Sequence, residues 1–131
     1  MLIIYMLVLI FTSIYDFKYH KIPNIIHIII FLIAIIMQRT SILGAITTAL
    51  PFFIIALIFE NSVGGGDVKY MLANGFMLGT SNGNTASLIA LLTAAIFICL
   101  YRVMNNKNIK EIALAPFLSF GCMIVILGGI L

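Results

Sequence analysis

Clusters of polar residues divide this chain into six apolar runs. The runs cover residues 1–15, 23–37, 41–59, 67–79, 85–103 and 112–131. Continuous apolar runs of this kind predict helices that are buried or lie in a membrane. The fourth run has 13 residues, fewer than the roughly 20 that a helix needs to cross a bilayer. We therefore expect this helix either to extend beyond the run or to begin below the membrane surface.

The composition excludes several classes of protein. Hydrophobic residues make up 63% of the 131 residues and charged residues 8%, whereas globular domains carry about 45–50% and about 25%. So few charges cannot cover a soluble domain, and so many apolar residues exclude a disordered chain. A transmembrane β-barrel would need alternating polar positions. The sequence predicts an all-α polytopic membrane protein with six transmembrane helices, forming a single domain over residues 1–131 in the lipid bilayer.

The basic residues predict how the helices are oriented in the membrane. The connections after the first, third and fifth runs contain Lys18, Lys21, Lys69, Arg102, Lys107 and Lys110. The other connections contain only Arg39. The positive-inside rule then places the first set in the cytoplasm and both termini outside. The first run lacks a basic start and a small-residue cleavage site, so we interpret it as a retained span. No basic patch stands apart from an apolar run, so nucleic acid is not an expected partner.

Small residues at a spacing of four predict where helices approach closely. The positions concerned are Gly44 and Thr48, Gly75 and Gly79, and Ala86, Ala90 and Ala94. Such spacings bring small side chains to one helix face, which lets two helices touch in lipid. The tripeptide at residues 82–84, Asn-Gly-Asn, predicts a tight turn between the fourth and fifth helices.

Two of the four acidic residues call for an explanation. Glu60 and Glu111 lie at the ends of runs, where a solvated carboxylate costs little. Asp16 follows 15 mostly apolar residues, and Asp67 follows three glycines at the start of the fourth run. Ionisable groups at such depths are costly and often functional. Structural alternatives remain open, because Asp67 could cap its helix and Asp16 could pair with a nearby lysine.

The two aspartates together suggest a reaction. They lie on separate predicted helices and on one predicted side of the membrane, so they could share a site. Two carboxylates that close would hold one proton between them. One could then act as a base on a water molecule and the other as an acid on a carbonyl. This chemistry needs no metal and no cofactor. Cys99 and Cys122 lack the spacing of a zinc site or a disulfide framework, and we expect both to be small buried hydrophobes.

Three stretches resemble motifs of the type IV prepilin peptidases. Residues 16–24, Asp-Phe-Lys-Tyr-His-Lys-Ile-Pro-Asn, resemble the first motif, in which an Asp and a short basic run precede Ile-Pro-Asn. Residues 64–69, Gly-Gly-Gly-Asp-Val-Lys, resemble the second, a Gly-x-Gly-Asp signature followed by Lys. Residues 115–118, Ala-Pro-Phe-Leu, resemble a late Pro-Phe segment. The two Asp motifs occurring together make the resemblance specific, and it covers nearly the whole chain.

The resemblance implies a membrane aspartic peptidase. Such enzymes remove the short basic leader from type IV pilins and pilin-like proteins at the cytoplasmic side of the inner membrane. By this resemblance Asp16 and Asp67 would be the catalytic pair, and Gly64, Gly65 and Gly66 would shape the approach of the substrate. The chain lacks the cytoplasmic region with paired Cys-x-x-Cys motifs found in bifunctional members. It therefore resembles the short form of Flp-type pilus systems and preflagellin peptidases, and methylation is not expected.

Several other polar residues have more than one interpretation. Lys69 belongs to the second motif, but it is two positions from Asp67 and is expected to extend to the membrane interface. Asn74 lies on the Asp67 face, where it either bonds across helices or supports the site. Lys18, Pro23 and Asn24 belong to the first motif and are possible supports. His27 is expected as a satisfied core histidine, and Glu60 or Glu111 could read the basic leader.

Other classes of function fit part of the pattern. A small proton-coupled transporter or channel could use the same two carboxylates. A purely structural membrane subunit would leave them without a role. A general intramembrane protease of the presenilin-like Gly-x-Gly-Asp type would share the second motif, but the Ile-Pro-Asn of residues 22–24 favours prepilin processing. The identity of the pilin substrate, the separation of the two aspartates and the oligomeric state do not follow from the sequence.

Overall fold

The chain folds into helices joined by short connections. The computed structural model describes residues 1–60, 62–106 and 112–129. Within these residues it has six helices, which are α1 (Leu2–Tyr19), α2 (Asn24–Ile36), α3 (Ile42–Ile58), α4 (Gly65–Leu78), α5 (Thr80–Asn105) and α6 (Ala115–Leu127). The all-α class and the number of helices predicted from the apolar runs are therefore confirmed for this part of the chain.

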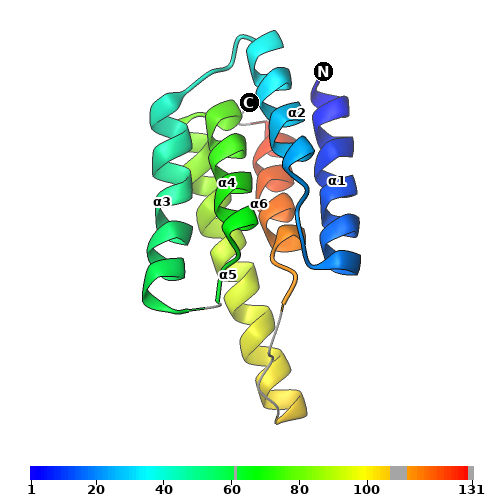
Figure 1. Cartoon of the computed structure of the whole chain (residues 1–131), viewed down its shortest axis with the longest axis vertical. Helices are drawn as coiled ribbons and strands as arrows, with labels where there is room; N and C mark the ends of the chain where they lie inside the picture. Colours follow the sequence, from blue (N-terminus) through cyan, green and yellow to red (C-terminus); the bar gives the residue numbers. More distant parts are fainter. Residues whose placement is uncertain (61, 107–111, 130–131) are drawn as a thin grey trace.

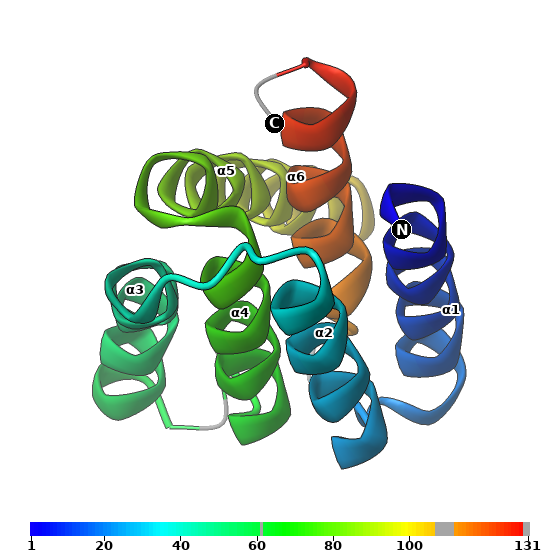
Figure 2. The ribbon, with the colours of Figure 1, turned by 90° about the horizontal axis from the view of Figure 1, so that it is seen from above.

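Successive helices run in opposite directions. Consequently α1, α3 and α5 finish at the same end of the bundle at which α2, α4 and α6 begin (Figure 1). We call this the motif end, because it carries both Asp motifs. Viewed from above, α4 lies between α2 and α3, while α6 lies between α5 and α1 (Figure 2). The lower part of α5 extends past the rest of the bundle at the motif end (Figure 1).

The predicted starts of the fifth and sixth helices are wrong. The Asn-Gly-Asn turn predicted at residues 82–84 is instead part of α5, and the reversal from α4 occurs at Gly79, which has a φ of 83°. One glycine in the left-handed region makes this turn without a longer loop. Gly83 lies inside the helix and faces the Thr48 side chain. A Cβ at this position would collide with Thr48, so the position requires glycine. Likewise α6 begins at Ala115 and not at residue 112, with Pro116 in its first turn, where proline is tolerated.

Close contacts between small residues hold α3, α4 and α5 together. A Cβ added to Gly44 would meet the backbone of Gly75 and Gly79, and one added to Gly75 would meet the Gly44 carbonyl oxygen and Thr48. A Cβ on Gly121 of α6 would collide with the backbone of Ala86 in α5. These contacts confirm that the predicted small-residue steps mark helix interfaces, since only small residues permit so close an approach.

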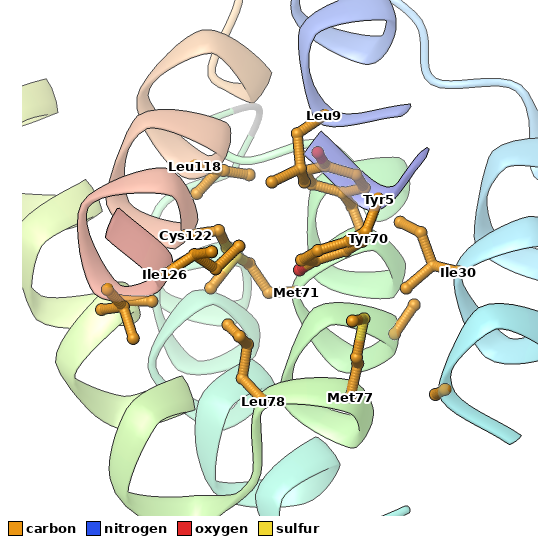
Figure 3. Packing of buried hydrophobic residues seen from close by; sticks show 14 of the residues in the cluster. Tyr5, Leu9, Ile30, Tyr70, Met71, Met77, Leu78, Leu118, Cys122 and Ile126 are labelled. Atoms are coloured by element: carbon orange, nitrogen blue, oxygen red, sulfur yellow. The ribbon is translucent and has the colours of Figure 1, made fainter. Parts of the chain in front are cut away.

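The core lies between α1, α2, α4 and α6. Tyr5 and Leu9 of α1, Tyr70 of α4 and Leu118 of α6 are buried together there (Figure 3). Polar atoms in this core are paired, as expected for buried groups. The Tyr5 hydroxyl donates to Asn74 Oδ1 at 2.6 Å, and the Asn74 amide donates to the Tyr70 carbonyl at 2.9 Å. Asn74 therefore bonds across helices, which was one of its two predicted roles.

Large apolar side chains cover the outside of the bundle. Ile3, Leu57 and Val103, for example, are 74%, 67% and 77% exposed. Helices α1 and α5 are long and apolar enough to cross a membrane by length and composition, whereas α2, α3 and α6 are apolar but shorter. Cys122 is buried as predicted, but Cys99 is exposed on α5, so the prediction for Cys99 was wrong.

The described basic residues follow the predicted two-sided distribution. Lys18 and Arg102 are in the last turns of α1 and α5, and Lys69 is in the first half of α4, all at the motif end. Arg39 lies in the connection from α2 to α3, at the opposite end. Lys107, Lys110 and Glu111, which also entered the sequence predictions, lie outside the described residues.

Candidate active site

Asp16 is a buried carboxylate near the end of α1. The helix continues past the apolar run that predicted it and ends at Tyr19, with His20 in the left-handed conformation. Asp16 is only 4% exposed. Its Oδ2 accepts a hydrogen bond of 3.0 Å from the backbone N–H of Ala115. Because Ala115 is the first residue of α6, the carboxylate of α1 also satisfies the start of a distant helix.

Asp67 is in the first turn of α4. Gly64 precedes the helix, Gly65 and Gly66 are its first residues, and Asp67 follows them. The backbone N–H of Gly64 donates to Asp67 Oδ2 at 3.2 Å. The helix-capping interpretation of Asp67 is thus partly correct, since its side chain closes the first turn. A negative charge there is also favoured by the helix dipole. Asp67 is half-buried.

The two aspartates line the same pocket at the motif end. This pocket has a volume of about 310 Å³. It is lined by Asp16, His20, Lys21, Ile22, Asn24, Gly64, Gly65, Gly66, Asp67 and Lys69. The pocket therefore brings together residues of α1, α2 and α4, including both aspartates.

The glycines before Asp67 leave space beside it. Gly64 has a φ of −71°, and neither Gly65 nor Gly66 has a positive φ. A Cβ on Gly65 would meet no atom within 4 Å, and one on Gly66 would make ordinary contact with Ile22. Neither backbone conformation nor helix contact thus requires glycine at residue 65. Because Gly65 has no side chain, the wall of the pocket is open at this position.

The other candidate residues fall into two groups. Lys69 is exposed and also lines the pocket, so it reaches the solvent at the rim of the site, and Asn24 lines the pocket as well. Lys18 is exposed and lies over the Tyr19 ring, 5.3 Å from its centroid, while Pro23 faces an apolar groove between α1 and α2. Neither Lys18 nor Pro23 lines the pocket.

Sequence reasoning missed one contact to the second motif. His27 is buried, as predicted for a core histidine, but its Nε2 lies 3.2 Å from the carbonyl oxygen of Gly66. Because a carbonyl oxygen only accepts, the histidine donates. His27 thus ties α2 to the first turn of α4 beside Asp67. Its position three residues after Asn24 was the only signal in the sequence, because this spacing places both residues on one helix face.

The arrangement suits acid–base chemistry. Among the described residues, no group of three His, Cys, Asp or Glu side chains is placed to hold a metal ion. The pocket contains two carboxyl groups from different helices. The side chains of His20, Lys21 and Lys69 line the same pocket. Two such carboxylates can supply a base and an acid to one substrate.

Comparisons with known proteins point to one family. A model of the type IV leader peptidase family matches residues 3–101. The match includes both aspartates and the three glycines, but residues 115–118, which also resembled the family, lie beyond it. Comparison with curated proteins found no match, and comparison with solved structures found none either.

Proposed function

We propose that this chain, which belongs to the type IV leader peptidase family, is a membrane aspartic endopeptidase. Its substrate would be a prepilin or pilin-like protein, possessing a short basic leader followed by an apolar helix. The observation that carries the proposal is the shared pocket of Asp16 and Asp67 at the motif end. Both residues lie within the part of the chain that the family model matches.

The proposed mechanism uses the two carboxyl groups with one proton between them. Two negative charges in one pocket repel each other, which favours a state with a single shared proton. The ionised carboxylate takes a proton from water, and the water oxygen attacks the carbonyl carbon at the leader junction. The protonated carboxyl group donates to the carbonyl oxygen. Collapse of the tetrahedral intermediate then breaks the C–N bond. The carboxyl group that took a proton from water donates it to the leaving amine, and the other carboxylate takes a proton back from a hydroxyl group of the intermediate.

The open wall at Gly65 supports this use of the pocket. An extended substrate backbone has to come close to the carboxyl groups to be cleaved, and a glycine beside Asp67 leaves room for it. Lys69 and Lys21 lie at the same pocket. Their positive charge would stabilise an ionised carboxylate, although it would repel a basic leader.

We propose an inner-membrane location with the motif end facing the cytoplasm. The exposed apolar side chains of the bundle would contact lipid. The described basic residues gather at the motif end, apart from Arg39, and the positive-inside rule assigns that end to the cytoplasm. All six helices would lie in the membrane, with both termini outside.

The geometry favours hydrolysis over the transporter alternative. Carriers of ions and substrates typically place their binding site near the middle of the bilayer. Asp16 and Asp67 instead lie in the last and first turns of their helices, at one end of the bundle. A junction between a polar leader and an apolar helix would meet the enzyme at that level.

Co-expression with a prepilin-like substrate tests the proposal. We expect the unmodified chain to shorten the substrate, and both Asp16→Asn and Asp67→Asn to abolish cleavage while still inserting into the membrane. Glu60→Gln is the matched control, because Glu60 is an exposed acid that does not line the pocket. Full cleavage by either aspartate variant would refute the paired mechanism. Loss of cleavage in Glu60→Gln as well would mean that the effect is not specific to the two aspartates, and it would agree with Glu60 reading the basic leader.

A further inference from the structure

A second hollow adjoins the candidate active site on the outside of the bundle. It lies between α2 and α4 and has a volume of about 250 Å³. Its lining consists of Asn24, His27, Ile28, Phe31, Lys69 and Leu72. We call it the α2–α4 groove. Asn24 and Lys69 line both this groove and the pocket of the two aspartates. The groove therefore adjoins the site at which cleavage is proposed.

The groove has a polar mouth and an apolar body. The residues that α2 contributes are three, four and seven positions after Asn24, so they form one stripe along the helix. Ile28 and Leu72 are 58% and 36% exposed, so the groove is open on its outer side. Phe31 is the last residue of this stripe, and its ring centroid lies 5.0 Å from that of Phe76.

The polar residues that line the groove either lie at its mouth or are already hydrogen-bonded. Asn24 and Lys69 are at the mouth, next to the aspartates. His27 is buried, and its Nε2 is used by the Gly66 carbonyl. The volume is below the roughly 300–1,000 Å³ of sites for small molecules, so the groove suits a side chain and not a whole ligand.

We infer that the α2–α4 groove binds an apolar side chain of the substrate next to the bond that is cut, on the side of the apolar helix. This inference rests on the proposed function and adds to it the place where the substrate is recognised. The opposite side of the substrate is the basic leader, which Lys69 at the mouth would repel. An apolar side chain gains by leaving water or headgroups for the groove.

The direction of the groove fits the same occupant. From Asn24 to Phe31 the helix advances by seven residues, roughly 10 Å at 1.5 Å per residue. This path leads from the motif end toward the middle of the bundle. In the proposed membrane orientation it points into the bilayer, which is where the apolar helix of the substrate runs. The substrate therefore crosses the aspartates first and the groove next.

Filling the groove tests the inference. Ile28→Trp and Leu72→Trp place a large ring in the groove at exposed positions, so the bundle need not rearrange. Ile35→Trp is the matched control, because Ile35 is 57% exposed on the same helix and does not line the groove. Two substrates are compared, one with Phe directly after the cut and one with Ala there. Initial cleavage rates are measured with equal amounts of each variant in the membrane.

The expected result is a change of preference. The two groove variants should cleave the Phe substrate at least about tenfold more slowly, because even one methylene group in an apolar pocket changes the rate by about tenfold to 200-fold. Cleavage of the Ala substrate should change much less. Leu72→Ala should accept a larger residue, such as Trp after the cut, better than the unmodified chain does. Ile35→Trp should retain the original preference.

Other outcomes separate the two proposals. If the unmodified chain cleaves neither substrate, the proposed function fails and the subsite with it. If it cleaves both and the groove variants lose activity equally on Phe and Ala substrates, or lose none, the subsite is refuted while the peptidase function stands. A loss of the Phe substrate in Ile35→Trp as well would also refute it, because the effect would then not belong to the groove.

Discussion

Asp16 Oδ2 accepts a hydrogen bond of 3.0 Å from the backbone N–H of Ala115, although 99 positions separate the two residues. Ala115 opens α6, and the first N–H groups of a helix have no partner inside it. Asp16 thus has a structural task in addition to its proposed catalytic one. It fixes the start of α6 against the end of α1 and holds one of its own oxygens in place.

Substitution at Asp16 should separate these two tasks. Asp16→Asn retains a carbonyl oxygen that can accept from Ala115, whereas Asp16→Ala leaves that buried N–H without a partner. We expect both variants to lose leader cleavage, but only Asp16→Ala to lose about 1–3 kcal/mol of stability, the usual cost of an unpaired buried group. Thermal unfolding of the purified variants in detergent measures the difference. Equal midpoints for the two variants would contradict the structural task.

Gly75→Ala should destabilise the bundle. A Cβ there would meet the Gly44 carbonyl oxygen and the Thr48 side chain, so α3 and α4 would have to move apart. Forced separation of well-packed elements typically costs about 1–3 kcal/mol. The measurement is again the thermal midpoint in detergent, compared with that of the unmodified chain. A midpoint unchanged by Gly75→Ala would show that α3 and α4 can move apart at little cost in stability.

Gly65→Ala should impair cleavage without destabilising the bundle. The added Cβ meets nothing within 4 Å, and alanine is a better helix former than glycine, so stability should stay equal or rise. Cleavage should nevertheless fall, because the methyl group occupies the space beside Asp67 that the substrate backbone needs. Initial rates and the thermal midpoint, measured on one preparation, test both statements. Unimpaired cleavage would mean that the substrate does not pass residue 65.

The helices could be predicted because they depend on local signals, and the position of both Asp motifs at one end of the bundle follows from the order of these helices. Apolar runs bounded by polar clusters give helices, and steps such as Gly44 with Thr48 mark contacts that the structure confirms. The Asn-Gly-Asn turn at residues 82–84 failed because local turn propensity was overridden. Gly79 makes the reversal alone, and Gly83 is needed as a small residue inside α5.

Long-range contacts could not be predicted. Nothing in residues 112–115 indicates that the first N–H of α6 meets a carboxylate of α1. Similarly, His27 was expected to be satisfied in the core, but its partner, the Gly66 carbonyl, is 39 positions away. Such pairs depend on how four helices, α1, α2, α4 and α6, meet at one end of the bundle. A single sequence contains the residues, but not that arrangement.

The contributions of Tyr5 and Asn74 to stability should be coupled through their hydrogen bond. It is buried and 2.6 Å long, so Tyr5→Phe leaves Asn74 Oδ1 without its partner, at a cost of about 1–3 kcal/mol. Asn74→Leu removes the other partner. If the bond is the main link between the two side chains, the double variant should be more stable than the sum of the single losses predicts. Thermal midpoints of the four proteins give the coupling, and strict additivity would contradict it.

His27 joins α2 to the first turn of α4 through the Gly66 carbonyl oxygen, which lies 3.2 Å from its Nε2. His27→Leu removes the donor, while His27→Gln retains an N–H group that can reach the same oxygen. A neutral hydrogen bond contributes about 0.5–1.5 kcal/mol. If that energy positions Asp67 for the reaction, His27→Leu should lower kcat roughly two- to tenfold. KM should stay nearly constant for the substrate with Ala after the cut, because that small side chain does not fill the groove that His27 also lines.

The Gln variant decides whether this is a positioning effect, since it should recover most of the lost kcat. A defect caused only by packing in the core would affect Gln and Leu alike. Such a defect would also appear as a lower thermal midpoint in proportion to the lost activity. Cleavage rates over a range of substrate concentrations, for the unmodified chain and both variants, distinguish these cases. If His27→Leu cleaves as fast as the unmodified chain, the contact to Gly66 serves folding alone.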